Sequence, residues 1–124
     1  MVMAFGGFLG LIGVPVPGVE IGIALSGVLL GAAVMTESRP PLILAAGLVA
    51  VFAICHGHAH GAELPPGTSA LTYSVGFVVA TGLLHASGIG IGTIHRWSFG
   101  RLALRALGGL ISMGGVFFLS QAFA

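Results

Sequence analysis

Apolar stretches separated by short polar breaks run along almost the whole chain. Prolines and charged residues mark these breaks, which lie at Val14–Gly18, Glu37–Pro41, Leu64–Ser69 and His95–Arg101. Most of the apolar stretches approach the length of about 20 residues that a helix needs to cross a bilayer. The pattern therefore predicts a series of transmembrane helices joined by short connections.

The spacing of the breaks predicts about four full spans and one short N-terminal helix. The first stretch, Met1–Gly13, would be only about 20 Å long as a helix, whereas the hydrocarbon core measures roughly 30 Å. We interpret it as the end of a longer span or as a half-helix packed on its neighbours. The predicted fold class is all-α, a polytopic transmembrane helical bundle that forms one integral membrane domain over residues 1–124. The full spans are expected at Val19–Thr36, Leu42–Glu63, Ala70–Ile94 and Leu102–Phe123.

Composition supports the membrane assignment and excludes other classes. The 124 residues have a mean hydropathy of +1.13 and only 6% of them are charged, so a soluble domain of this size could not bury the apolar surface. The chain has no lysine, and its 4 arginines are too scattered for a nucleic-acid-binding surface. A single cysteine cannot form an internal disulfide.

The arginines also predict an orientation. Arg39 lies in the second break, and Arg96, Arg101 and Arg105 lie at the fourth. Even-numbered breaks of a helical bundle lie on one side of the membrane, and positive residues favour the cytoplasmic side. The proline-rich breaks and the C-terminus are therefore expected outside.

The main candidate site lies at the end of the third apolar stretch, in the segment Cys55–Glu63. Because helical residues turn by about 100°, His56, His60 and Glu63 fall within an arc of roughly 60°, whereas His58 points to nearly the opposite face. Two imidazoles and a carboxylate can converge on nickel, zinc, cobalt or copper(II). Ionisable groups are costly in a bilayer and usually face a bundle interior. We expect a metal or proton site here; the alternative is helix-end histidines among lipid headgroups.

Other polar residues extend this candidate site. Glu20 opens the first full span, either as an assisting ligand at similar depth or as an interfacial charge. His85 lies deeper in its own span and shares a face with Thr81, so this face can line a path. The alternatives are a Thr81 hydroxyl bonded to its own helix and a buried histidine bonded to a neighbour. Cys55 is expected to be a small buried hydrophobe, with a ligand role as the alternative. His58 is expected to face another helix, and could be a ligand only if the helix unwinds near Gly57 or Gly61.

Several motifs follow one another along the chain: Val19-Glu20, then His56-Gly57-x-Ala59-His60-Gly61-x-Glu63-x-Pro65, then Tyr73, Gly76-Phe77, Thr81, Leu84-His85 and Gly88. These motifs resemble the HupE/UreJ family. This resemblance implies a small protein of the bacterial inner membrane that accompanies nickel–iron hydrogenases or ureases and admits nickel, or cobalt, to the cell. It implies that His56, His60, Glu63 and His85 hold the metal. We expect Ni²⁺ (or Co²⁺ or Zn²⁺) as a bound or transported ion and no cofactor.

One departure from the family pattern concerns the N-terminal side. Family members carry His-Pro and Gly-x-Asp-His motifs on earlier membrane segments, and this chain has neither. We therefore expect a form without those segments, or one that receives further helices from another chain. Glycine-rich faces allow close helix approach, which favours an oligomer. These faces carry Gly27 and Gly31, and Gly108, Gly109 and Gly115.

Two other functional classes stay open. Paired histidines on a helix also occur in zinc hydrolases, where a glutamate between them is the base, but Gly57, His58 and Ala59 fill that interval here. An intramembrane metallohydrolase that uses Glu63 is therefore less favoured, and we expect no enzyme. The other alternative is a non-transporting membrane accessory subunit that binds a partner through its glycine-rich faces.

Overall fold

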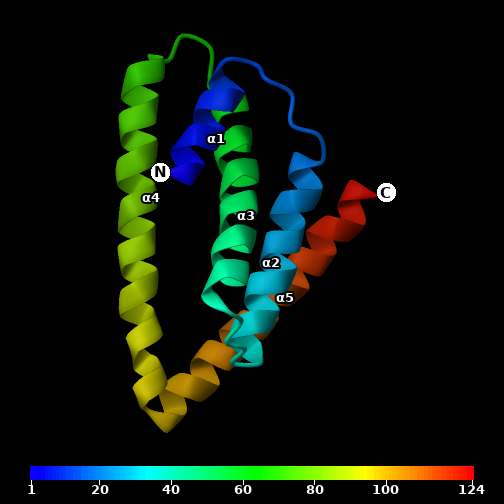
Figure 1. The fold of residues 1–124 in the computed structure, drawn as a ribbon, viewed down its shortest axis with the longest axis vertical. Coiled ribbons are helices and arrows are strands. Elements are labelled where there is room, and N and C mark those ends of the chain that lie inside the picture. Colours follow the sequence, from blue (N-terminus) through cyan, green and yellow to red (C-terminus); the bar gives the residue numbers. More distant parts are fainter. The chain divides into compact units, whose positions relative to one another are not determined.

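The computed structural model describes residues 1–124, and every regular element in it is a helix. The predicted all-α class is confirmed, and the proline-rich segments separate helices as expected. Figure 1 shows the elements in chain order: α1 (Val2–Leu11), α2 (Val19–Met35), α3 (Leu42–Ala62), α4 (Ala70–Gly92), the 3-10 helix η1 (Thr93–Arg96) and α5 (Ser98–Ala122).

Three helical stretches are long and apolar enough to cross a membrane: α3, α4 continued by η1, and α5. The expected span at Val19–Thr36 forms α2, whose 17 residues make a helix of about 26 Å. This length is at the lower end of the range for a membrane span. The short N-terminal stretch forms α1, which has 10 residues.

The predicted loop His95–Arg101 is almost entirely helical, so that prediction is wrong. η1 ends at Arg96, Trp97 alone is extended (φ −103°, ψ 144°), and α5 begins directly after it. Gly100 permits this sharp corner, because a Cβ there would overlap the carbonyl group of Ile94. The prediction followed the charged residues, but arginine is compatible with a helix interior.

The chain forms two compact units, each built from segments that are distant in sequence. The histidine unit comprises Met1–Val19 and Leu42–His85, and so contains α1, α3 and most of α4. The arginine unit comprises Glu20–Pro41 and Ala86–Ala124, and so contains most of α2, the end of α4, η1 and α5. Four of the 5 histidines lie in the first unit, and all 4 arginines lie in the second.

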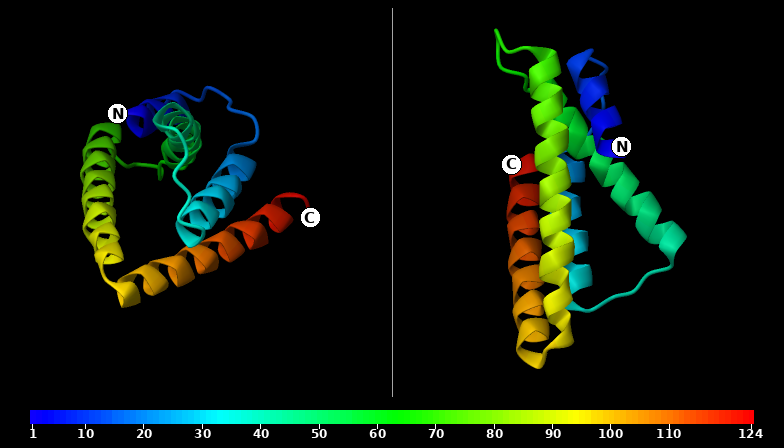
Figure 2. Two further views of the ribbon diagram at one scale, coloured as in Figure 1. Left: turned by 60° about the horizontal axis from the view of Figure 1, so that its bottom comes forward. Right: turned by 90° about the vertical axis from the view of Figure 1, so that its left-hand side faces the viewer.

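In the histidine unit, α1 lies against the C-terminal half of α3, as Figures 1 and 2 show. The contact uses Gly6 and Gly10 of α1 with Gly57 and Gly61 of α3, and a Cβ at any of the four would overlap the backbone of the other helix. Each pair has the small-xxx-small spacing that lets helices approach closely. This interface confirms that the short first segment packs on a neighbour.

In the arginine unit, α2 and α5 pack through the same kind of contact (Figure 2). A Cβ on Gly31 would lie 2.6 Å from the carbonyl oxygen of Gly108, and one on Gly108 would lie 2.7 Å from the carbonyl oxygen of Gly31. The Ser112 hydroxyl donates a hydrogen bond of 3.0 Å to the Val28 carbonyl across this interface.

This packing corrects the reason for expecting an oligomer. The faces of Gly27, Gly31, Gly108 and Gly115 meet within one chain, and Gly109 lies against the side chain of Met35. These glycines therefore do not leave the open contact surface that the expectation assumed. Association with further chains stays a prediction, but these glycines no longer support it.

Candidate functional site

Two histidines of the histidine unit are held by the backbone of their own helix. His56 Nδ1 lies 2.9 Å from the Phe52 carbonyl oxygen, and His85 Nδ1 lies 2.8 Å from the Thr81 carbonyl oxygen. A carbonyl oxygen only accepts, so Nδ1 carries the proton in both rings. In the neutral ring this leaves the lone pair of Nε2 for another partner, which is the arrangement that metal-ligating histidines usually show. Both rings are thus prepared as Nε2 ligands.

His58 is engaged differently. Its Nε2 lies 2.7 Å from the carbonyl oxygen of Val14, in the connection that follows α1. Because a carbonyl oxygen only accepts, Nε2 of His58 donates this hydrogen bond and is therefore already occupied. His58 was expected to face another helix, whereas its ring contacts the connection between α1 and α2. Its observed contact ties α3 to the connection before α2.

His60 lies where α1, α3 and α4 meet. Its ring is tilted against that of Phe77, with centroids 5.2 Å apart, and its backbone carbonyl accepts a hydrogen bond of 2.9 Å from the Tyr73 hydroxyl. The carbonyl belongs to the last turn of α3, where no intrahelical donor remains. Tyr73 therefore joins the end of α3 to the start of α4 at the level of the His60 ring.

Two adjacent cavities follow this face of α4. The smaller, of about 240 Å³, is lined by His60, Tyr73 and Ser74, and the larger, of about 420 Å³, is lined by Thr81 and His85. Each therefore carries one imidazole. Residues of α1 and α3 complete both walls. Three residues line both cavities: Ala4, Phe77 and Val78.

Neither Glu63 nor Glu20 is among the residues that line these cavities. Glu63 follows the last residue of α3 and is exposed, although its amide still donates to the Ala59 carbonyl at 3.1 Å. Glu20 lies in the first turn of α2 and belongs to the arginine unit. Their predicted roles as ligands stay predictions.

No group of three or more histidine, cysteine, aspartate or glutamate side chains is close enough to hold one metal ion. The structure therefore does not bring together the predicted trio of His56, His60 and Glu63. It places His60 and His85 on adjacent cavities, and His56 beside neither. Cys55 is buried with a free thiol, which agrees with its interpretation as a small hydrophobe.

Sequence reasoning did not single out Tyr73 and Phe77 as parts of the site. A signal was present, because Tyr73, Phe77, Thr81 and His85 recur every four residues. Residues four apart are neighbours on a helix face, so this spacing predicts one continuous stripe. The stripe links the hydroxyl bonded to the His60 carbonyl, the ring beside His60 and the lining of the larger cavity.

Comparison with known proteins gives a concordant result. The family model for HupE / UreJ proteins matches residues 1–118. The chain is 41% identical over 115 residues to the Protein HupE of Rhizobium leguminosarum bv. viciae, an alignment that covers 93% of this chain. The chain spans 60% of the length of that relative. No solved structure matches the chain.

Proposed function

This chain belongs to the HupE/UreJ family, and we propose that its histidine unit lets a divalent transition-metal ion, nickel first, pass across the bacterial inner membrane to supply hydrogenase or urease maturation. The observation that carries this proposal is the pair of adjacent cavities on one face of α4, with His60 beside one and His85 beside the other. Imidazole is a good ligand for nickel and a poor one for magnesium, which prefers oxygen.

The cavities have a size suited to a partly hydrated ion. Each water takes about 30 Å³ in the liquid, so a shell of about six waters needs roughly 180 Å³. The cavity volumes of about 240 Å³ and 420 Å³ exceed this requirement. An ion can then exchange one or two waters for an imidazole nitrogen without losing its whole shell. Such limited ligation suits passage, because a transported ion must bind well enough to enter and weakly enough to leave.

The residues of the path have separate roles in this proposal. His60 meets the ion in the outer cavity, with Glu63 and His56 near the same helix end as further ligands during entry. Phe77 is the largest of the three residues that line both cavities, so its ring controls movement between them. Nε2 of His85 then receives the ion in the deeper cavity, where Thr81 also lies.

The test of the proposal is nickel uptake into proteoliposomes. Liposomes containing the chain should accumulate ⁶³Ni²⁺ faster than protein-free liposomes, and His60→Ala should reduce the initial rate roughly tenfold or more. Titration calorimetry of the same proteins with Ni²⁺ should show weaker binding for His60→Ala. Uptake equal to that of protein-free liposomes, together with unchanged binding, would reject the proposal.

The second candidate is a non-transporting accessory subunit, and the surface of α4 favours it. Five glycines of α4, spread around the helix, have open space at the position of a Cβ, so another helix could approach α4 closely. This function would survive the loss of His60 and His85. The five are Gly76, Gly82, Gly88, Gly90 and Gly92.

We further propose that the Arg39 connection and the Arg96–Arg105 region face the cytoplasm, with Pro65-Pro66 on the other side. The support is the distribution of arginines over the connections. Single cysteines at Ser38 and Ser69, in a Cys55→Ala background, flank opposite ends of α3. An impermeant thiol reagent should label them from opposite sides of the membrane, and labelling of both from one side would reject this orientation.

A further inference from the structure

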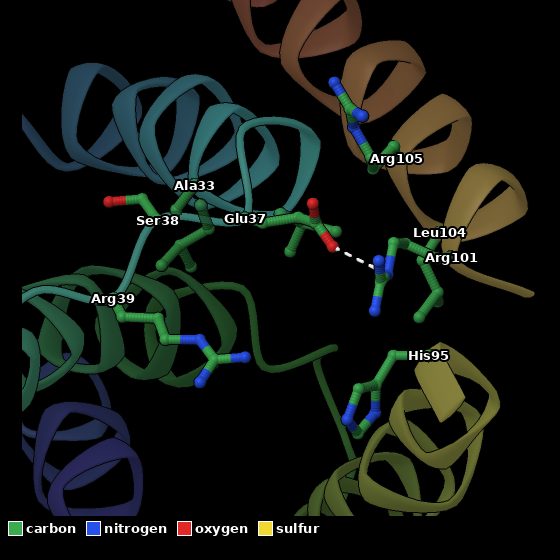
Figure 3. Close-up of a pocket in the computed structure, with 10 residues that line it drawn as sticks. Ala33, Glu37, Ser38, Arg39, His95, Arg101, Leu104 and Arg105 are labelled. Atoms are coloured by element: carbon green, nitrogen blue, oxygen red, sulfur yellow. Dashed lines mark ion pairs between the residues drawn. The ribbon is translucent and has the colours of Figure 1, made fainter. Parts of the chain in front are cut away.

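A charged pocket lies in the arginine unit, where the C-terminus of α2 meets the start of α5. Its volume is about 320 Å³, and three of the chain's four arginines line it: Arg39, Arg101 and Arg105. In Figure 3, Arg39 extends from the connection after α2 towards His95 and Arg101, which border the same space. Most of the positive charge of the chain is thus concentrated at one place.

The charges in this pocket do not balance. Arg101 Nε lies 3.3 Å from Glu37 Oε1, which is the only ion pair in the chain (Figure 3). Arg105 Nε donates a hydrogen bond of 2.8 Å to the Met35 carbonyl, which satisfies the end of α2 but leaves the positive charge uncompensated. Arg39 has no carboxylate within ion-pair distance. Three positive charges less one negative charge leave an excess of two, which an anion can neutralise.

Part of the pocket wall is apolar. Leu30, Val34 and Leu104 line it beside the arginines. Two large aromatic residues follow η1 at the same corner, and both are exposed: Trp97 at 64% and Phe99 at 82%. Exposed tryptophan at the end of apolar helices is typical of the membrane–water interface. The pocket therefore combines an anion-binding end with an apolar wall at the depth where lipid headgroups lie.

We propose that this pocket binds an anionic phospholipid, with the phosphate between Arg39 and Arg101 and an acyl chain along Leu30, Val34 and Leu104. Arginine binds phosphate oxygens through two parallel N–H groups, which makes it better suited than a point charge to hold a phosphodiester. A free phosphate ion would satisfy the arginines but would leave the apolar wall without a partner. The combination of both features favours the lipid.

The test is lipid retention measured by native mass spectrometry. The chain is placed in nanodiscs of equal parts phosphatidylglycerol and phosphatidylcholine, extracted gently, and the lipid adducts are counted. We expect phosphatidylglycerol to be retained preferentially. Arg39→Gln should lower its retention about fivefold, the size expected for the loss of one arginine near an anionic headgroup. Arg96→Gln is the matched control, because Arg96 does not line the pocket.

A second variant acts in the opposite direction. Glu37→Gln removes the carboxylate that neutralises Arg101, so it should raise phosphatidylglycerol retention above that of the unmodified chain. Inorganic phosphate at millimolar concentration should not displace the lipid. Equal retention of both lipids, a loss in Arg96→Gln as large as in Arg39→Gln, lower retention in Glu37→Gln, or displacement by phosphate would each overturn the proposal.

Discussion

The histidine unit and the arginine unit use the same packing device and place different chemistry beside it. In each, two helices approach through glycines until their backbones are in contact, α1 on α3 in one and α2 on α5 in the other. In the histidine unit a third helix, α4, borders cavities that carry His60 and His85. In the arginine unit, ionic and polar side chains close one end of the helix pair. The comparison teaches that glycines set the helix separation, and that the neighbouring side chains decide what the unit can bind.

The largest effect should follow from filling the α1–α3 contact. Gly57→Val would drive a side chain into the backbone of Met3, so we expect a loss of stability at or above the upper end of about 1–3 kcal/mol for overpacking. Gly47→Val on the same helix is the control, because nothing lies within 4 Å of that position. Denaturant unfolding followed by circular dichroism measures both. Equal losses in the two variants would show that the glycine contact does not hold α1 in place.

The corresponding change in the other unit should separate packing from metal binding. Gly31→Val meets the Gly108 carbonyl at 2.6 Å, so it should also cost roughly 1–3 kcal/mol, whereas Gly114→Val, in open space, should cost little. Nickel binding measured by calorimetry should persist in Gly31→Val and fall in Gly57→Val. If both variants lose nickel binding to the same extent, the two units do not have separate roles.

Two histidine variants on α3 should differ in nickel affinity, because Nε2 is free in His56 but bonded in His58. His56→Ala removes an Nε2 prepared for a ligand and should lower nickel affinity about tenfold, or about 1.4 kcal/mol. His58→Ala breaks the hydrogen bond to Val14 and should cost about 1 kcal/mol of stability, with affinity changed by less than about twofold. Calorimetry and unfolding on both proteins provide the comparison. A large affinity loss in His58→Ala would contradict the assignment of its nitrogen to Val14.

The smallest effect concerns the contact between α3 and α4. Tyr73→Phe removes the hydroxyl that donates to the His60 carbonyl, and hydrogen bonds between membrane helices are worth about 0.6 kcal/mol on average. We expect a stability loss of about that size in thermal unfolding. Ser120→Ala, which removes a hydroxyl bonded within its own helix, should cost less. A larger loss in Ser120→Ala would argue against a role for Tyr73 in joining the two helices.

Much of the fold could be predicted from local sequence properties. Prolines and apolar stretches located the helices, because a proline lacks the amide hydrogen that a helix interior needs and a bilayer demands about 20 apolar residues. The start of α5 was missed because charge was taken as the mark of a loop. The partner of each glycine face could not be predicted, since Gly27 and Gly31 allow a close approach without specifying whether the neighbour is α5 or another chain.

The candidate site was predicted less completely, for a related reason. Helical spacing indicates which residues share a face, but not what the face meets. Helical spacing placed His56, His60 and Glu63 on one face. However, α3 ends at Ala62, before Glu63, and only His60 of the three lines a cavity. The stripe from Tyr73 to His85 could have been found by the same rule, had aromatic residues been included with the polar ones.

The most direct test of the account is the rate of nickel entry in a matched pair of histidine variants. Both side chains bond a backbone carbonyl, but His85 lines the larger cavity and His58 lines neither. In proteoliposomes containing equal amounts of folded protein, His85→Ala should slow ⁶³Ni²⁺ uptake roughly tenfold, while His58→Ala should keep most of the rate. Uptake in His85→Ala equal to that of the unmodified chain, or an equal loss in both variants, would contradict a metal path along this face of α4.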